Sequence, residues 1–230
     1  MHSLAVNAQG EIFIDEYPVD GLGAAAKVVD SLVAGSTVKP VVFALAINSA
    51  VTIGYAKKVK GLIRRHYREI VVQRITGGQA TYVRYPPLSD EAPDLSKMKP
   101  RNVFNLYVSS EMVEELNRNK RYGDLLRLKA DVREFLVSDT TDHTLPELSR
   151  KDVPWFGKTL TASSSIVALR ADSLIPYGTY QQVYDSITEV YFDLYDESAL
   201  RQFGQPFAAV DPFQRNAIKT IYPFVLAELD

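Results

Sequence analysis

One short polar segment of this 230-residue sequence contains residue types that could do chemistry. Asp139, Asp142 and His143 lie within five consecutive positions, and two carboxylates beside an imidazole could bind a metal ion or transfer protons. The same composition is common in solvated loops, and we favour a loop over an enzyme site. The enzyme alternative would require metal-dependent turnover that is lost in Asp139→Ala.

A second acidic group, Asp193, Asp196 and Glu197, has the spacing of one helix face. Such carboxylates can hold a cation, but a solvated helix surface is their commoner role. The chain has no cysteine, and it lacks the sequence patterns of nucleotide-binding loops, zinc proteases and serine hydrolases. We therefore predict no enzyme activity, no catalytic residue, no metal site and no cofactor.

The segment 165–187 is the element best suited to position functional side chains. Its apolar run Ile166–Leu169 predicts a buried strand, and Asp172 begins a polar turn in which it would cap the next helix. Pro176 suits the first turn of that helix. The side chains that follow recur at helical spacing and predict a buried or interacting face: Tyr180, Val183, Tyr184 and Ile187.

The same unit occurs earlier in the chain. A shift of 124 positions places residues 42–63 on 166–187 without a gap, and six of the twenty-two pairs are identical. Chance would give about one or two identities, so we predict a duplication rather than two unrelated strand–turn–helix units. The identical pairs are Ala44 and Ala168, Leu45 and Leu169, Ser49 and Ser173, Gly54 and Gly178, Val59 and Val183, and Ile63 and Ile187.

A proline-rich stretch at 86–101 divides the chain, and we predict it to be a linker between a first unit, 1–85, and a second unit, 102–230. In the first unit we expect a hairpin at 4–6 and 12–14, helices at 24–33 and 54–67, and strands at 41–47, 69–75 and 80–83. In the second unit we expect strands at 102–108 and from 166, and helices at 124–136, 176–203 and 211–229, the last interrupted at Pro223.

These elements predict the α+β class. Each unit would be a small mixed β-sheet with two helices packed on it, and a C-terminal helix would extend the second unit. The net charge of -2 gives no reason to expect nucleic acid as a partner. We expect one basic cluster to be solvated, with an anionic partner as the alternative: Lys57, Lys58, Lys60, Arg64, Arg65 and Arg68.

The signature of the second unit resembles the periplasmic domain of the ExbD/TolR family. It consists of Arg170-Ala171-Asp172, then Pro176-Tyr177-Gly178, then an amphipathic helix. The opening hairpin resembles that domain too. From about residue 86 onward the chain is similar to the ExbD-like proteins of Bacteroidetes-type bacteria, and the first unit matches less closely because Asn48 and Ile53 replace the family's Asp and Tyr. The segments that carry the narrower resemblance are 101–104, 153–160, 176–178, 201–207 and 219–223.

The resemblance implies biopolymer transport by energy transduction in the TonB system rather than catalysis. ExbD and TolR work at the inner membrane with an ExbB/TolQ-like channel protein and a TonB/TolA-like transducer. The family's proton-carrying aspartate lies in an N-terminal transmembrane helix that this sequence does not contain, so none of its aspartates inherits that role. We expect a periplasmic domain anchored by such a helix, with these partner-binding residues: Arg170, Asp172, Tyr177, Tyr180 and Tyr184.

The internal repeat allows two forms of assembly. The chain could form a dimer, or its two copies could pack as an internal pseudo-dimer and join their sheets. A partner segment could also add to an exposed strand edge. The alternative function is a peptidoglycan- or peptide-binding periplasmic module, which saturable muropeptide binding would support.

Overall fold

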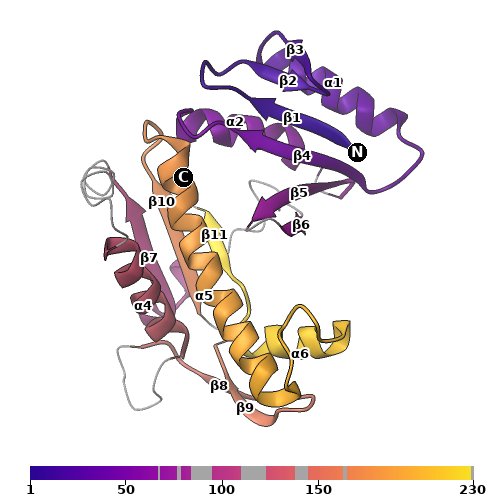
Figure 1. Ribbon diagram of the computed structural model, residues 1–230. Coiled ribbons are helices and arrows are strands. Elements are labelled where there is room, and N and C mark those ends of the chain that lie inside the picture. The colour runs from indigo at the N-terminus through magenta and orange to yellow at the C-terminus, as the bar shows by residue number, and fades with distance from the viewer. Residues whose placement is uncertain are drawn as a thin grey trace. The chain divides into compact units, whose positions relative to one another are not determined.

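The computed structural model describes residues 1–66, 68–76, 79–83, 95–109, 123–137, 145–162 and 165–228. Helices and both parallel and antiparallel strand pairs are present, which confirms the predicted α+β class (Figure 1). The chain divides into two compact units, the first made of residues 1–92 with 172–180 and the second of residues 93–171 with 181–230. The division after residue 92 falls inside the stretch predicted to be a linker, but 172–180 joins the first unit.

The first unit contains a six-stranded sheet in the order β3-β2-β1-β4-β5-β6. Strands β1, β4 and β5 are parallel at its centre, and β2, β3 and β6 extend it antiparallel at the two edges. The strands are β1 His2–Val6, β2 Ile12–Ile14, β3 Tyr17–Val19, β4 Val41–Ile47, β5 Ile70–Thr76 and β6 Gln79–Val83. The helices are α1 Gly21–Gly35 and α2 Ile53–Arg64.

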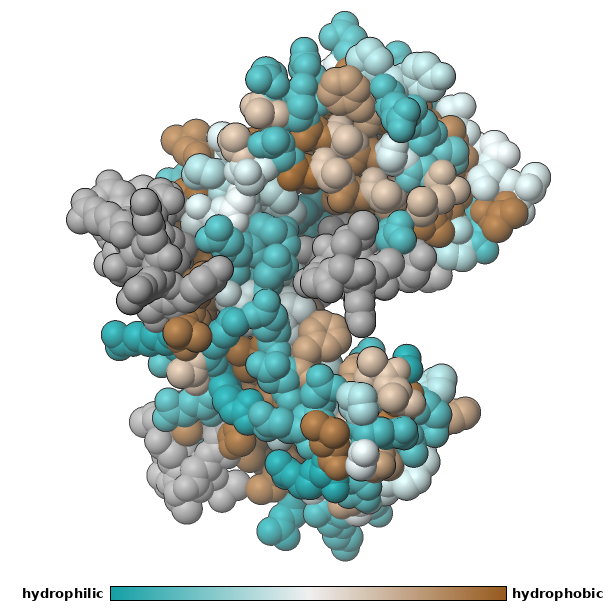
Figure 2. Space-filling view, viewed as in Figure 1, coloured by the Kyte–Doolittle hydropathy of each residue, from teal (hydrophilic) through white to brown (hydrophobic). Residues whose placement is uncertain are grey.

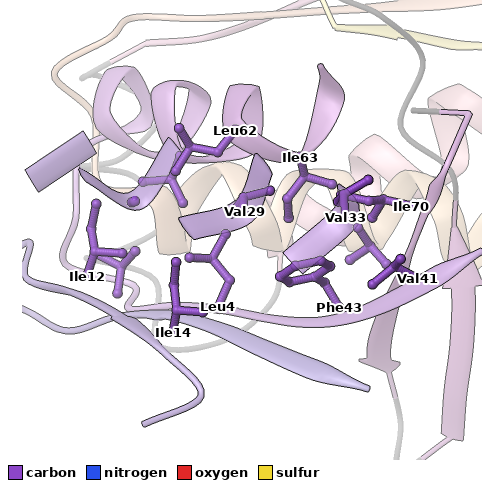
Figure 3. Packing of buried hydrophobic residues seen from close by; sticks show 14 of the residues in the cluster. Leu4, Ile12, Ile14, Val29, Val33, Val41, Phe43, Leu62, Ile63 and Ile70 are labelled. Carbon is purple, nitrogen blue, oxygen red and sulfur yellow. The ribbon is translucent and has the colours of Figure 1, made fainter. Parts of the chain in front are cut away.

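Both helices of the first unit bury their apolar faces in one core on the sheet (Figure 3). Helix α1 contributes residues four apart, Ala25, Val29 and Val33, because side chains at that spacing lie above one another on a helix. Phe43 of β4 is fully buried at the centre, since alternate residues of a strand face the same side. The repeated strand–turn–helix of the first copy is therefore part of a packed core.

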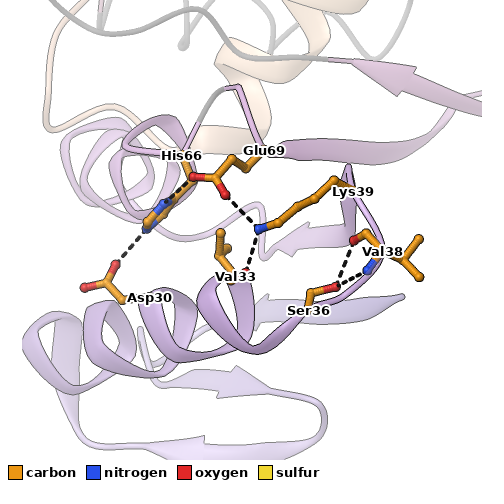
Figure 4. A network of polar contacts seen from close by, with 7 residues as sticks. All are labelled: Asp30, Val33, Ser36, Val38, Lys39, His66 and Glu69. Carbon is orange, nitrogen blue, oxygen red and sulfur yellow. Dashed lines mark hydrogen bonds and ion pairs between the residues drawn. The ribbon is translucent and has the colours of Figure 1, made fainter.

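A network of polar contacts connects the end of α1 to the segments before β4 and β5 (Figure 4). The ammonium of Lys39 donates to the backbone carbonyl of Val33 at 2.6 Å and lies 2.7 Å from a carboxylate oxygen of Glu69. The His66 ring lies 2.8 Å from an Asp30 carboxylate oxygen. The hydrogen bond from Lys39 lowers the pKa of Glu69, and the hydrogen bond from His66 lowers the pKa of Asp30.

We expect Lys39→Gln to raise the pKa of Glu69 towards its ordinary value, because the substitution removes the Lys39 hydrogen bond and its positive charge, which both favour the ionised carboxylate. A depressed carboxyl pKa stabilises the fold above the unfolded-state pKa, and this contribution is lost as the pH falls through the folded-state value. Titration of the Glu69 carboxyl carbon by NMR measures the change. Lys27→Gln on the exposed side of α1 serves as the control, and an unchanged Glu69 pKa in Lys39→Gln would contradict the expectation.

The second unit contains a three-stranded sheet in the order β11-β10-β7, and these described strands are all parallel. A separate hairpin is formed by β8 and β9. The strands are β7 Val103–Val108, β8 Ser149–Val153, β9 Gly157–Thr161, β10 Ile166–Ala171 and β11 Leu226–Glu228. The helices are α4 Gly123–Val137, α5 Tyr177–Phe203 and α6 Pro212–Ile221, with short 3₁₀ turns at Leu95–Lys97 and Pro100–Asn102. The first residues of α5, up to Tyr180, belong to the first unit.

Strand β10 is buried along Ile166–Leu169, as the continuous apolar run predicts. Helix α4 packs on the sheet through the Phe104–Phe135 ring contact, whose centroids are 5.3 Å apart. Arg133 of α4 lies 2.6 Å from Glu197 of α5, which connects the two helices. Figure 2 shows that, on the visible face of this unit, hydrophobic residues are scattered among hydrophilic ones.

When β2, β3 and β6 of the first half and β8, β9 and α6 of the second half are left aside, the remaining elements of the two halves follow one order around a central parallel strand. In the first half the order is β1, α1, β4, α2, β5, with β4 at the centre of the parallel strands. In the second half it is β7, α4, β10, α5, β11, with β10 at the centre. This shared order supports the duplication inferred from the residues.

The prediction of a last helix reaching residue 229 is wrong. Helix α6 ends at Ile221, and Leu226–Glu228 forms β11 beside β10. Pro223 has no N–H and disfavours a helical backbone at Tyr222, whose φ is -122° and ψ 79°. The chain therefore leaves the helix and completes the parallel sheet. The β8–β9 hairpin was not predicted, because its turn places Trp155 in the left-handed region at φ 65°.

We expect Asp211→Ala to destabilise the second unit by about 1 kcal/mol, because Asp211 caps α6. Its carboxylate accepts hydrogen bonds from the backbone N–H groups of Phe213 and Gln214, at 2.8 and 2.9 Å. The Gln214 side chain accepts in return from the Asp211 N–H at 3.1 Å. Urea denaturation measures the loss; Asp211→Asn should keep most of the stability, and equal stability of the alanine variant would contradict the cap.

Candidate interaction site

The turns of the two repeat copies contact each other inside the first unit. We call them the paired turns and define them as residues 48–54 and 172–178. Residues 172–180 belong to the first unit, so the contact is internal to that unit. An isolated antiparallel bridge joins Thr52 to Pro176 at the centre of the contact, and these two positions are 124 residues apart, the spacing of the repeat.

The paired turns are joined by reciprocal backbone hydrogen bonds. Ile53 N–H donates to the Ile175 carbonyl at 2.9 Å, and the equivalent bond runs from Tyr177 N–H to the Val51 carbonyl at 2.6 Å. A second pair, Gly54 to Ser173 and Gly178 to Ser49, has donor–acceptor distances of 2.9 Å in both directions. The repeat shift converts each bond into its counterpart, so the contact is locally two-fold, as in a homodimer interface.

These bonds provide acceptors for backbone N–H groups at the starts of two helices. The first N–H groups of an α-helix have no partner within the helix. Here α2 starts at Ile53 and α5 starts at Tyr177, and the first two N–H groups of each helix donate to carbonyls of the opposite turn. Each copy therefore caps the helix of the other.

Glycine is required where the paired turns approach most closely. A Cβ atom at Gly178 would lie 2.7 Å from the Cβ of Ser49, and one at Gly54 would lie 3.1 Å from the Cβ of Ser173. Carbon atoms normally stay about 3.5 Å or more apart. The two glycines identified by the repeat are therefore explained by this contact.

Each turn is also shaped by one side chain at an equivalent position. Asn48 accepts a hydrogen bond from the backbone N–H of Ala50 at 3.0 Å, and Asp172 accepts from that of Leu174 at 3.1 Å. Such bonds define Asx turns. Asp172 was expected to cap the helix; its side chain instead stabilises the turn before the helix.

A buried cation lies beside the second turn. The Lys60 ammonium is 5.1 Å from the ring centroid of Tyr177 and 5.4 Å from that of Tyr180. Lys60 and Arg64 have exposed fractions of only 5% and 9%, so the prediction of a solvated basic cluster is wrong for these two residues. A desolvated cation over aromatic rings contributes up to about 2 kcal/mol per contact.

The structure separates the five predicted partner-binding residues. Tyr177 and Tyr180 stack with centroids 6.1 Å apart and are buried in the first unit, beside the exposed Asp172. Arg170 is exposed at the end of β10, and Tyr184 is half-buried on α5, both in the second unit. Tyr177 and Tyr180 would touch a partner only if the turn opened, whereas Arg170 and Asp172 are accessible.

Sequence reasoning missed the role of Lys60. Lys60 lies among other basic residues at 57–68, so its burial cannot be recognised from composition. Its equivalent in the second copy is Tyr184, so the repeat does not identify it either. Only the packing of the tyrosines around the ammonium shows that this lysine differs from Lys57 and Lys58.

Of the two acidic candidate groups, only the second lies in the described part of the chain. Asp139, Asp142 and His143 lie outside the described residues. In the second acidic set, Asp196 accepts from the Phe207 N–H at 2.7 Å and Glu197 binds Arg133, so both have structural partners. No group of three or more residues suited to a metal ion occurs among the described residues.

Among the helices described, none has the length and apolar character needed to cross a membrane. Comparison with protein-family models, curated proteins and solved structures found no match to this chain.

Proposed function

We propose that this chain is a periplasmic, non-enzymatic component of a proton-motive-force-driven energy-transduction system of the ExbD/TolR type. It would act by protein–protein contact with an ExbB/TolQ-like channel protein and a TonB/TolA-like transducer. The observation that carries the proposal is the reciprocal hydrogen bonding of the paired turns. Three residues of the segment that resembles the family signature, Pro176, Tyr177 and Gly178, make this contact.

The paired turns offer a physical route for relaying a mechanical signal. Because α2 and α5 cap each other, a displacement at the start of one helix removes hydrogen bonds from the start of the other. A partner bound at the exposed Asp172 would bias this contact only if it binds the paired and unpaired states with different affinity. The contact needs no covalent chemistry, which agrees with a binding and relaying role.

The proposal also refines the idea of an internal pseudo-dimer. The described strands of the two copies lie in separate sheets, so the expected joining of sheets does not occur among them. The turns of the two copies make the symmetric contact instead. One chain then carries, within its first unit, a contact of the kind that a homodimer makes between subunits.

Site-specific photo-crosslinking in the native bacterium tests the proposed function. A photoreactive residue replaces Asp172, which is exposed on the second turn, and Lys27 on the exposed side of α1 serves as the control position. We expect position 172 to cross-link to a TonB/TolA-like transducer, and an uncoupler of the proton gradient to change the yield. The proposal would be refuted if position 172 formed no cross-link to such a transducer and the uncoupler left the cross-linking yield unchanged.

One observation favours the alternative function, a peptide- or peptidoglycan-binding module. The second unit contains a cavity with both apolar and polar walls, and ligand sites usually have that composition. Saturable binding of muropeptides by the full chain, together with no effect of the uncoupler on cross-linking, would favour this alternative over the motor component.

A further inference from the structure

A cavity of about 270 Å³ lies within the second unit. Its walls come from the end of α4, the β8–β9 hairpin, α5 and the end of α6. Leu136, Phe156 and Ile221 supply apolar surface, and Ser198, Arg201 and Tyr222 supply polar groups. The volume is slightly below the 300–1,000 Å³ typical of sites for drug-sized molecules, so the cavity suits a smaller ligand.

The walls of this cavity are held by backbone and side-chain contacts. The Ala162 N–H donates to the carbonyl of Ile221 at 3.0 Å, which fixes the end of β9 against α6. The Gln202 side chain donates to the carbonyl of Trp155 at 2.8 Å, which fixes the hairpin turn against α5. Val153, fully buried, packs with Ile221 beneath the hairpin. The cavity is therefore built on ordered elements.

The charges around the cavity are unbalanced. Arg201 lines the cavity, is exposed to solvent, and forms no hydrogen bond or ion pair with any described residue. The nearby Arg133 is neutralised by Glu197 at 2.6 Å. Burial raises the pKa of Tyr222 and outweighs the opposing effect of the two arginines, so its hydroxyl stays protonated and can donate. Among the described residues, the cavity thus presents one solvent-exposed guanidinium without an ion-pair partner and a phenol.

We propose that this cavity binds a small apolar monocarboxylate, with the carboxylate on Arg201 and the hydrocarbon group against Leu136, Phe156 and Ile221. A guanidinium matches the two oxygens of a carboxylate in a planar, bidentate arrangement. A phosphate dianion would bring two charges to a single uncompensated cation. A free acid and the C-terminal residue of a peptide share this chemistry, and neither depends on the proposed motor role.

Calorimetric titration of the full chain tests the site with two probes, 4-methylpentanoate for a free acid and N-acetylleucine for a peptide C-terminus. We expect saturable binding of at least one acid and at least tenfold weaker binding of the matching amide, which lacks the charge. Binding of 4-methylpentanoate alone identifies a free-acid site, and binding of N-acetylleucine identifies a site for a peptide end. No saturable binding of either acid overturns the proposal.

Two variants locate the binding. Arg201→Gln removes the charge and should weaken binding by about tenfold or more, whereas Arg127→Gln, on an exposed part of α4, should leave affinity unchanged. Thr159→Phe places a ring in the cavity from β9, where aromatic residues are well tolerated, and should abolish binding. Circular dichroism verifies that each variant is folded. Wild-type affinity in either folded cavity variant would overturn the proposed site.

Discussion

Gly178→Ala is expected to destabilise the first unit by about 1–2 kcal/mol, although alanine normally favours a helix over glycine. The new Cβ would lie 2.7 Å from the Cβ of Ser49 and 3.3 Å from its carbonyl oxygen, which accepts the Gly178 hydrogen bond. The second turn must therefore move away and weaken the bonds that cap α2 and α5. Urea denaturation measures the stability, and hydrogen exchange at the Tyr177 amide measures the opening of the paired turns.

The two-fold relation supplies controls for this prediction. Ser49→Gly removes the atom that alanine at position 178 would strike, so the double variant should recover most of the lost stability. By the same geometry, Gly54→Ala should be relieved by Ser173→Gly. Gly23→Ala in α1, where a Cβ meets nothing within 4 Å, should be neutral or stabilising. Equal stability of the alanine variants at positions 178 and 23 would contradict the close contact.

Phe43→Ala is expected to lower the free energy of unfolding by about 3–5 kcal/mol. Phe43 is fully buried at the centre of β4, opposite His2 of β1 and Val72 of β5 in the strand register. Figure 3 shows its ring among the side chains of both helices and the neighbouring strands. Removing the ring leaves a cavity that a close-packed core cannot fill.

Far-UV circular dichroism during urea denaturation measures the loss caused by Phe43→Ala. Since a domain is typically stable by about 5–15 kcal/mol, a large fraction of the variant is expected to unfold on mild heating. Phe213→Ala, at a position that is 77% exposed on α6, should change stability by less than about 0.5 kcal/mol. The single tryptophan, Trp155, lies in the second unit and reports by fluorescence whether that unit unfolds in the same transition. A wild-type midpoint for Phe43→Ala would show that the ring is not part of the core.

Much of the fold could be predicted from the sequence because most elements depend on local pattern. The strand 41–47 matches β4 residue for residue, and the helix at 124–136 differs from α4 by one residue at each end. The prediction of the last helix was wrong for a local reason as well. Pro223 prevents α6 from continuing, and the apolar residues beyond it belong to strand β11. The β8–β9 hairpin was missed because its turn holds a tryptophan in a conformation that usually favours glycine.

The candidate site contains residues that the sequence predicted, and the structure adds others that it did not predict. Asp172, Tyr177 and Tyr180 were selected from the repeat and the resemblance, and the structure places them on or beside the second turn. The buried Lys60 and the exposed, cavity-lining Arg201 were not selected, because lysine and arginine on a charged helix are usually solvated. Burial and pairing depend on neighbours that are distant in sequence.

The α+β class can be predicted from the sequence, and so can the similarity of two segments 124 residues apart, with their Asx side chains and glycines at equivalent positions. These features depend on local composition and on residue identities, so they can be recognised without knowledge of tertiary contacts. The three-dimensional structure was needed to show that the turn 172–178 packs against its counterpart 48–54 and that each turn caps the helix of the other. That pairing depends on backbone groups brought together across 124 residues, and backbone N–H and carbonyl groups are the same in every sequence.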